Sequence, residues 1–436
     1  MDRLPYCLLL QILSRLKDSA DVARCRVASK AFNTVFPGLR SICLKQHINS
    51  RSRVSVFLNL ISKLEAVESV CIVLQLPACE SDNLYLVDGD FAKEWLPRVS
   101  GSLKSLSLSG FLCEHQWNVL PLISSHCHNL VNLRLKLASL SVHNLNPMPM
   151  LTNLALEFVT LEDEHLNKLN KCFPNLQVLN LVGVRGLKDP KIHLLNLKTC
   201  LWPVFSNHLR SLTVIAPKLI ALIVGCTMPV AFRVEAPMLY HLHIRFPALT
   251  NADAFVPKKF ENLKSLWLEA PYIDSMLSEF PITKTVESLT VGSNKKALRY
   301  TTCSKFTLRK AFTVLPNLSS LCIRSTAWSE LEACLNLEDW EILDGKKGLK
   351  TICAYVTLAD QSLAFSSLAC VLDQCVSLSD VSLLIHRKDF GRVYESFMSK
   401  CIARWPRLKW RWGKWSERKR DSWITTDISN LSPQII

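Results

Sequence analysis

Side chains that could bind a metal or carry out catalysis are scattered along this 436-residue chain. His126-Cys127-His128 comes nearest to a metal-binding sequence. No cysteine pair stands at zinc spacing from it, so we expect no metal site. The chain has no GxxxxGK[ST] or GxGxxG phosphate loop, no GxSxG elbow and no HExxH pair. We therefore expect a protein that is not an enzyme and that uses no cofactor.

The positive charge of the chain lies at its two ends. Residues 1–53 carry a net charge of +7 and residues 400–436 one of +6, against +15 for the whole chain. A nucleic-acid-binding protein is expected to have a basic stripe along its binding face, which the nearly neutral residues 54–399 do not provide. The basic N-terminal end suits an acidic protein partner instead.

Residues 4–36 predict a compact pair of helices that needs a partner. Pro5 suits the first turn of a helix, because that position has no helical N–H bond to lose. Apolar residues then recur at helical spacing: Leu9, Ile12, Leu13 and Leu16. Asp18 can cap a second helix, which Pro37-Gly38 ends. A unit this short cannot bury so many apolar side chains by itself.

The first residues could instead belong to a secretory signal peptide. Pro5, Gln11 and Arg15 interrupt the apolar run, however, and no small-x-small cleavage site follows. The 17 cysteines include no CxxC pair, which favours reduced thiols over a secreted disulfide framework. The longest apolar run, residues 219–232, is too short to cross a bilayer. We therefore expect a cytoplasmic and/or nuclear protein with no membrane partner.

The string Leu-Pro-x-x-Leu-Leu-x-x-Ile-Leu-Ser-x-Leu, with Arg-Cys-x-Val-x-Ser-Lys-x-Phe after it, resembles an F-box. The resemblance covers residues 4–32. It implies docking onto a Skp-type adaptor, which would link the chain to a cullin–RING ubiquitin ligase. Carried over position by position, it places the adaptor contacts on Leu4, Pro5, Leu8, Ile12, Leu13, Leu16, Cys25, Val27, Ser29, Lys30 and Phe32.

Beyond this segment the chain repeats a Leu-x-x-Leu-x-Leu frame. Copies with Leu, Val or Ile at the three positions begin at residues 103, 130, 151, 176, 209, 219, 239, 263, 286, 318 and 378. Many successive copies are separated by spacings in the twenties, as in leucine-rich repeats. The frames, together with Ala-Pro-x-Leu at residues 216–219 and 236–239, resemble the plant-type F-box/leucine-rich-repeat family.

We therefore expect an α/β chain in which an N-terminal helical F-box precedes an irregular leucine-rich-repeat solenoid. The expected domains are the F-box over residues 1–45, a linker with an initial repeat over 46–99, leucine-rich repeats over 100–330, and irregular repeats with a cap over 331–436. The two Ala-Pro-x-Leu copies are only twenty residues apart, so their return segments should be extended or short 3₁₀ turns.

The tail from Leu408 to Arg420 alternates tryptophans with lysines and arginines. Such a stretch can stack bases and neutralise phosphate. The same alternation predicts a closing strand whose Leu408, Trp410 and Trp412 face the core while Lys409 and Arg411 face water. We favour the strand, because a solenoid needs a cap at its end.

The residues that flank the last two apolar positions of each frame point away from the core, and in a solenoid they line the concave face. Trp267 is the most informative of them, because exposed tryptophan is a common interface anchor. We expect a protein substrate to bind Arg134, His241, His243, Arg245, Trp267 and Glu269. Alternatively, a helix or loop covers Trp267.

The resemblance implies a substrate-recognition subunit of a Skp–cullin–F-box ubiquitin ligase, which recruits a protein substrate through its repeats. Such a subunit acts by proximity, because it holds substrate lysines near a charged ubiquitin carrier. The alternative is a basic repeat scaffold that binds nucleic acid or phosphorylated ligands. We favour the ligase subunit and expect no nucleic-acid partner.

Overall fold

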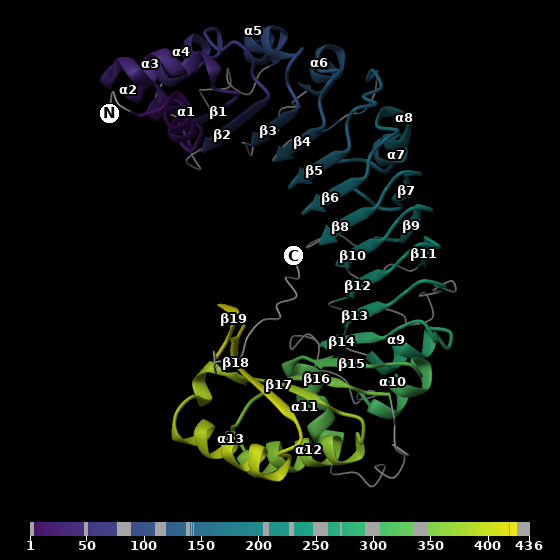
Figure 1. The fold of residues 1–436 in the computed structure, drawn as a ribbon. Helices are drawn as coiled ribbons and strands as arrows, with labels where there is room; N and C mark the ends of the chain where they lie inside the picture. The colour runs from purple at the N-terminus through teal and green to yellow at the C-terminus, as the bar shows by residue number, and fades with distance from the viewer. Residues whose placement is uncertain are drawn as a thin grey trace. The chain divides into compact units, whose positions relative to one another are not determined.

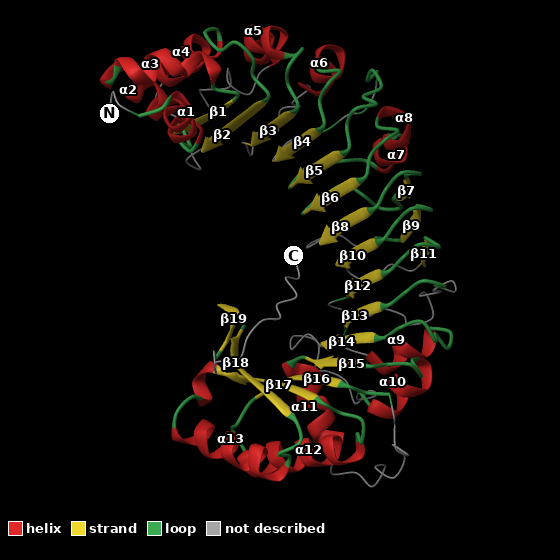
Figure 2. Ribbon diagram, in the orientation of Figure 1, coloured by secondary structure: helices red, strands yellow, loops and turns green. Residues whose placement is uncertain are grey.

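Short parallel strands, joined by helices or extended segments, build both compact units of the chain, Met1–Met238 (unit 1) and Leu239–Ile436 (unit 2). Figures 1 and 2 show these elements in a computed structural model of the protein. The structure describes residues 4–47, 51–75, 89–109, 119–136, 140, 142, 144–203, 209–225, 231–246, 260–270, 273–292, 306–334, 348–417 and 419–424.

Unit 1 begins with a helical module, residues 4–38. It contains α1 (Tyr6–Ser14), α2 (Ser19–Ala28), α3 (Lys30–Val35) and the 3₁₀ turn η1 (Phe36–Gly38). The Pro5 carbonyl accepts the first hydrogen bonds of α1, and the Asp18 carboxylate caps α2 by accepting from the Ala20 N–H at 3.2 Å. The predicted proline start and aspartate cap are both present. Phe32 and Phe36 form part of the module's small core.

Eight parallel strands follow in unit 1, each in register with the next. In order they are β1 (Ser41–His47), β2 (Ser69–Gln75), β3 (Ser105–Ser109), β4 (Asn132–Lys136), β5 (Asn153–Glu157), β6 (Val178–Val182), β8 (Thr199–Pro203) and β10 (Ala221–Gly225). The helices between them are α4 (Arg51–Ile61), α5 (Gly89–Val99), α6 (Val119–His126), α7 (Asp163–Asn167) and α8 (Leu169–Cys172). Figure 2 shows these helices along one face of the strands.

A second, three-stranded sheet replaces helices in the later part of unit 1. Its strands are β7 (Lys191–His193), β9 (Ser211–Ile215) and β11 (Ala231–Glu235), in the order β11-β9-β7. The return segments of the tightly spaced repeats are therefore extended, as predicted. The frame that begins at Leu209 lies in β9 of this second sheet, although its pattern is the same as that of the frames in the main row. Alternate residues are buried in both sheets, and the pattern alone cannot distinguish them.

Unit 2 continues the same plan. Its strands are β12 (His241–Arg245), β13 (Ser265–Glu269), β14 (Ser288–Gly292), β15 (Ser320–Ile323), β16 (Thr351–Val356), β17 (Asp380–His386), β18 (Lys409–Ser416) and β19 (Lys419–Trp423), of which the last pairs antiparallel. Its helices are α9 (Ile273–Glu279), α10 (Leu308–Val314), α11 (Ser325–Cys334), α12 (Gln361–Gln374), η4 (Arg387–Asp389) and α13 (Arg392–Arg404).

Parallel strands are present before residue 100, the predicted start of the repeats. Strand β1 begins at Ser41 and pairs with β2 over seven residues. The residues before and within these strands, Leu39, Ile42 and Leu44, then Val67, Val70 and Ile72, are buried like the leucines of later frames. The domain boundaries stay a prediction, and these two strands extend the row of repeats toward the helical module.

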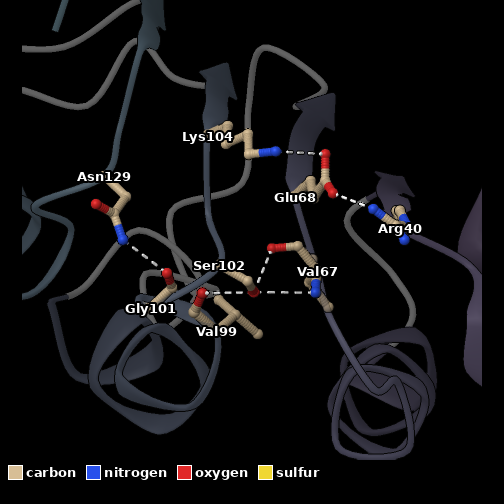
Figure 3. A network of polar contacts seen from close by, with 8 residues as sticks. All are labelled: Arg40, Val67, Glu68, Val99, Gly101, Ser102, Lys104 and Asn129. Carbon is tan, nitrogen blue, oxygen red and sulfur yellow. Dashed lines mark hydrogen bonds and ion pairs between the residues drawn. The ribbon is translucent and has the colours of Figure 1, made fainter. Parts of the chain in front are cut away.

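Hydrogen bonds between neighbouring turns hold each strand of the row in register with the next. The Lys104 carbonyl, for example, accepts from the N–H groups of Val131 and Asn132 at 2.8 and 2.9 Å. Figure 3 shows side chains that add to this ladder. Glu68 pairs with Arg40 at 2.5 Å and with Lys104 at 3.2 Å, and the Ser102 hydroxyl donates to the Val67 carbonyl. Three successive repeats are thus joined at the start of their strands.

Among the described residues, asparagines directly before a buried leucine bond to the turn of the preceding repeat. In each, the side-chain N–H donates to a main-chain carbonyl at 2.7 to 3.0 Å. The pairs are Asn129 with Gly101, which Figure 3 shows, Asn175 with Pro149, Asn196 with Pro174, and Asn317 with Lys284. These bonds satisfy turn carbonyls that the strand ladder does not use.

The tryptophan-rich tail forms the closing strand that the sequence predicts. Strand β18 pairs in register with β17, and Trp412 and Trp415 are buried. Leu408 is buried and Trp410 half-buried, while Lys409 and Arg411 are exposed. The Trp415 indole N–H donates to the Val356 carbonyl at 3.1 Å.

Removing the residues after Cys401 should destabilise unit 2. The truncation deletes β18 and leaves the apolar side of β17 without its neighbour. Losing a large buried aromatic side chain costs about 3–5 kcal/mol, so we expect a lower melting temperature and aggregation in calorimetry and light scattering. A soluble truncated protein with unchanged melting and a lost, salt-dependent affinity for RNA or DNA would contradict this role and favour nucleic-acid binding by the tail.

Candidate functional site

The first helix presents an apolar face to solvent. Leu8 and Ile12 are four residues apart, so they lie on one side of α1, and Leu4 lies just before the helix. Leu4, Leu8 and Ile12 have 39%, 43% and 41% of their surface exposed. Leu9 and Leu13, on the other side, are only 4% and 1% exposed because they pack into the module's own core. The helical module is thus too small to cover all of its apolar residues, as the sequence predicts.

The remaining predicted adaptor residues differ in their accessibility. Pro5, Val27 and Lys30 are exposed, and Leu16, Cys25 and Ser29 are half-buried. Leu13 and Phe32 are buried inside the module. We therefore expect these two residues to support the docking face from beneath and the exposed ones to contact a partner. We call Leu4, Leu8, Ile12 and Val27 the docking residues.

A second group of candidate residues lies on unit 2, on the strand face that points away from the leucine core. In-register pairing aligns one residue from each strand there: His243, Trp267, Thr290, Cys322, Cys353, Ser382 and Arg411. The row beside it includes Arg245, Glu269, Gly292, Tyr355 and Leu384. We call these two rows, with Arg324, the unit 2 surface.

His243 and Trp267 stack on each other at the start of this surface. Their ring centroids are 4.1 Å apart and their planes differ by 8°. Glu269 pairs with Arg245, with 3.1 Å between Oε2 and Nε. Burial, together with the charges of Arg245 and Arg324, lowers the pKa of His243 to about 4. His243 is therefore neutral at pH 7, and its 3.8 Å approach to Glu269 is no ion pair at that pH.

Arg324 connects this stack to a second aromatic group. Its guanidinium carbon lies 5.6 Å from the Trp267 ring centroid and 4.9 Å from that of Tyr355, within the range of cation–π attraction. Gly292 gives the arginine room, since a Cβ there would lie 3.3 Å from Arg324 Cδ. The Tyr355 hydroxyl in turn donates to Asp421 of β19 at 2.7 Å.

Several donors on the unit 2 surface have no acceptor within the described part of the chain. Trp267 Nε1 and His243 Nε2 are buried without a hydrogen-bond partner there. Among those same residues, no carboxylate forms an ion pair with Arg324. These two ring nitrogens are too deeply buried to meet a ligand, whereas the half-buried guanidinium of Arg324 is suited to pairing with an acidic group.

Five of the six predicted substrate residues meet on two neighbouring strands. His241, His243 and Arg245 lie on β12, and Trp267 and Glu269 on β13. The sixth, Arg134, belongs to unit 1, where it pairs with Glu157 of β5 at 2.5 Å. The frame that begins at Leu318 also predicts that Arg324 points outward, although Arg324 is not one of the six predicted substrate residues. Tyr355 is not predicted, because no frame is recognised for its strand, β16.

The described residues contain no cluster of three or more His, Cys, Asp and Glu that could hold a metal ion. In the segment His126-Cys127-His128, Cys127 is buried in the core and His126 Nδ1 lies 3.0 Å from the Leu122 carbonyl oxygen. In the part of the chain that the structure describes, helices fall short of the length and apolar character needed to cross a membrane.

A helical module with an open apolar face, followed by parallel-strand repeats, defines the class of F-box proteins with leucine-rich repeats. No model of a known protein family matches the chain. The chain is similar to F-box/LRR-repeat protein At4g29420 of Arabidopsis thaliana, with 35% identity over 451 aligned residues that cover 97% of this chain and 100% of the relative. The chain therefore belongs to the F-box/LRR-repeat protein family.

Replacing His243 with Phe should reduce the acid sensitivity of the protein. Because the pKa of His243 falls from 6.5 to about 4 on folding, the unfolded chain takes up a proton more readily than the folded one below pH 6.5. The contribution of neutral His243 to the free energy of unfolding is thus fully present above pH 6.5 and is lost as the pH falls toward 4. The loss from this group is about 2 kcal/mol at pH 5.

His243→Phe keeps a ring against Trp267 but cannot take up a proton. We expect its melting temperature to fall less than that of the wild type between pH 7 and pH 5, as measured by calorimetry. His241→Phe, two residues away on the same strand, is the matched control. Equal declines in wild type and His243→Phe would show that His243 is not the buried neutral group described above.

Proposed function

We propose that this protein is the substrate-recognition subunit of a Skp–cullin–F-box ubiquitin ligase. The exposed apolar residues Leu8 and Ile12 of α1, together with Leu4 just before the helix, carry this proposal. These side chains are open to solvent although the module has a core into which Leu9 and Leu13 pack. Membership of the F-box/LRR-repeat family supports the same function.

In this function the helical module binds a Skp-type adaptor, and through it a cullin–RING ligase. The docking residues supply apolar contact area, and the basic N-terminal end would steer an acidic adaptor toward the module. The repeats hold a protein substrate beside the ubiquitin carrier. Catalysis then depends on effective concentration, and this subunit needs no catalytic residue and no cofactor. A cytoplasmic and/or nuclear location follows from these partners.

We propose the unit 2 surface as the place where the substrate binds. Arg324 is half-buried beside the rings of Trp267 and Tyr355, and among the described residues no carboxylate forms an ion pair with it. Arg245 is already paired with Glu269. A carboxylate or phosphate group would give Arg324 a charged partner, and the aromatic rings would contact the adjacent apolar atoms. An acidic or phosphorylated protein segment has this chemistry.

The nucleic-acid alternative has less support. Trp412 and Trp415 are buried in the closing strand, where their rings cannot stack on bases. Arg411 lies over the Trp423 ring and Lys414 over the Phe390 ring, at 4.5 and 3.8 Å from the ring centroids. The basic and aromatic residues of the tail thus contact one another within the cap.

Replacing Ile12 with Asp should abolish binding of a Skp-type adaptor. The change places a charge in the middle of an apolar contact, and burying an unpaired charge costs enough to weaken binding by at least about 100-fold. Ile12 is exposed, so the module itself should stay folded. Adaptor binding is measured by pull-down of a purified adaptor with the full chain, and folding of the variant is checked by circular dichroism.

Ile282→Asp is the matched control, because Ile282 is also exposed but lies in unit 2. It should bind the adaptor like the wild type. Wild-type adaptor binding by a folded Ile12→Asp protein would show that α1 is not the docking element.

Replacing Arg324 with Gln should weaken binding of acidic segments. The readout is an array of acidic, phosphorylated and neutral peptides, probed with the full chain at low and physiological salt. A lost hydrogen-bonded charge pair corresponds to about a 10- to 100-fold loss of affinity. Arg309→Gln removes the same charge from the exposed side of α10 and should leave binding unchanged. Equal binding by the wild type and both variants would contradict the substrate surface but leave adaptor docking untouched.

A further inference from the structure

Two cysteines lie side by side where the repeats begin. Cys43 of β1 and Cys71 of β2 are direct partners in the parallel register. Neighbouring strands in a sheet are about 4.8 Å apart, and disulfides join residues whose Cα atoms are separated by about 4.4–6.8 Å. Both cysteines are free and half-buried, so small reagents can reach them. They face the side of the strands that points away from the leucine core.

The surroundings of the pair favour a thiolate at one of the two sulfurs. Cys71 lies between Cys43 on β1 and Ser107 on β3 in the register, so a thiol and a hydroxyl flank its sulfur and favour the anion there. The charges of Lys45 and Arg134 favour the anion further. Although burial opposes the charge, these contacts together lower the pKa of Cys71 from 9.0 to about 6, while that of Cys43 is raised.

The other cysteines among the described residues differ from this pair in their access or in their surroundings. Cys200 and Cys401 are buried, and burial raises the pKa of each thiol to about 12. Cys322 and Cys353 form a second in-register pair on β15 and β16, but they pack against the apolar cluster of Tyr355, Leu384 and Trp415. Activated thiols are accessible and lie in a positively charged setting, which describes Cys71.

We propose that Cys43 and Cys71 form a peroxide-reactive thiol pair, in which Cys71 is the attacking thiolate and Cys43 the resolving thiol. The Cys71 thiolate attacks one oxygen of hydrogen peroxide, the O–O bond breaks, and the departing hydroxide takes a proton to become water. The sulfenic acid formed on Cys71 is then attacked by the Cys43 sulfur. A disulfide forms, and the hydroxide released takes the Cys43 proton as a second water. Two thiols are oxidised and one peroxide is reduced.

The site lies at the junction between the repeats and the helical module. The Lys45 N–H, two residues beyond Cys43, donates to the Asp18 carboxylate at 3.4 Å, and that carboxylate also caps α2. A disulfide would therefore fix β1 to β2 directly beside the proposed docking element. In-register bridges between adjacent strands are strained, so this one should be easily reduced.

Serine substitutions test the roles of the two cysteines in the full chain. Serine already occupies the next position of the same row, Ser107 on β3, so it should fit without unfolding the strands. The reduced wild type is treated with hydrogen peroxide, blocked with iodoacetamide and digested for mass spectrometry without reduction. We expect one disulfide between Cys43 and Cys71, which dithiothreitol reverses. In Cys43→Ser, dimedone should trap a sulfenic acid on Cys71, and in Cys71→Ser the Cys43 thiol should stay reduced.

Alkylation of the untreated wild type at pH 7 provides a measurement free of substitutions. A thiol with a pKa of 6 is almost fully ionised at pH 7, but its thiolate is a weaker nucleophile, so the net rate gain over an ordinary thiol is about fourfold. Cys25 and Cys370, which are also half-buried, are the controls. Alkylation of Cys71 no faster than the controls would overturn the proposal. So would a peroxide-induced disulfide at Cys322 and Cys353 in place of Cys43 and Cys71.

Discussion

The parallel register between successive repeats is the constraint on which the rest of the structure depends. A turn carbonyl such as that of Lys104 or Glu287 accepts two N–H groups from the next repeat, which fixes where the next strand begins. Within each unit, the apolar positions of successive repeats then stack on one another, and the outward positions line up in rows. His243 meets Trp267, and Cys43 meets Cys71, for this reason alone. Residues in different repeats become neighbours because their strands pair in register, so equivalent positions of adjacent frames lie side by side.

Unlike the repeats, the helical module cannot bury all of its own apolar side chains. It has too few residues to enclose its leucines, so burying Leu9 and Leu13 leaves Leu4, Leu8 and Ile12 in water. An apolar face that a partner must cover is a natural docking element, whereas the repeats are self-sufficient and free to vary on their outward side. One chain thus combines an exposed apolar face on its helical module with a unit 2 surface whose chemistry depends on a few residues such as Arg324.

The periodicity of the sequence predicts the repeat architecture better than it predicts where each strand lies and which residues of neighbouring strands pair. The frames with three clear aliphatic residues were found, but β8 and β16 were missed because Cys200, Trp202 and Ala354 stand where leucine was sought. The frame of β9 gives no sign that this strand belongs to the second sheet, because Leu212 and Val214 alternate in the same way on either one. The pairing of His243 with Trp267 could be predicted, since their frames are adjacent. The contact of Arg324 with Tyr355 could not, because the length of the segment between their strands hides the register.

Hydrogen–deuterium exchange of the full chain, with and without a purified Skp-type adaptor, tests the central claim most directly. The adaptor should slow exchange in residues 4–35, where the docking residues and the helices beneath them lie, and leave the strands of unit 2 unchanged. Protection of the repeat strands with none in α1, or no protection anywhere at saturating adaptor, would contradict docking through the helical module.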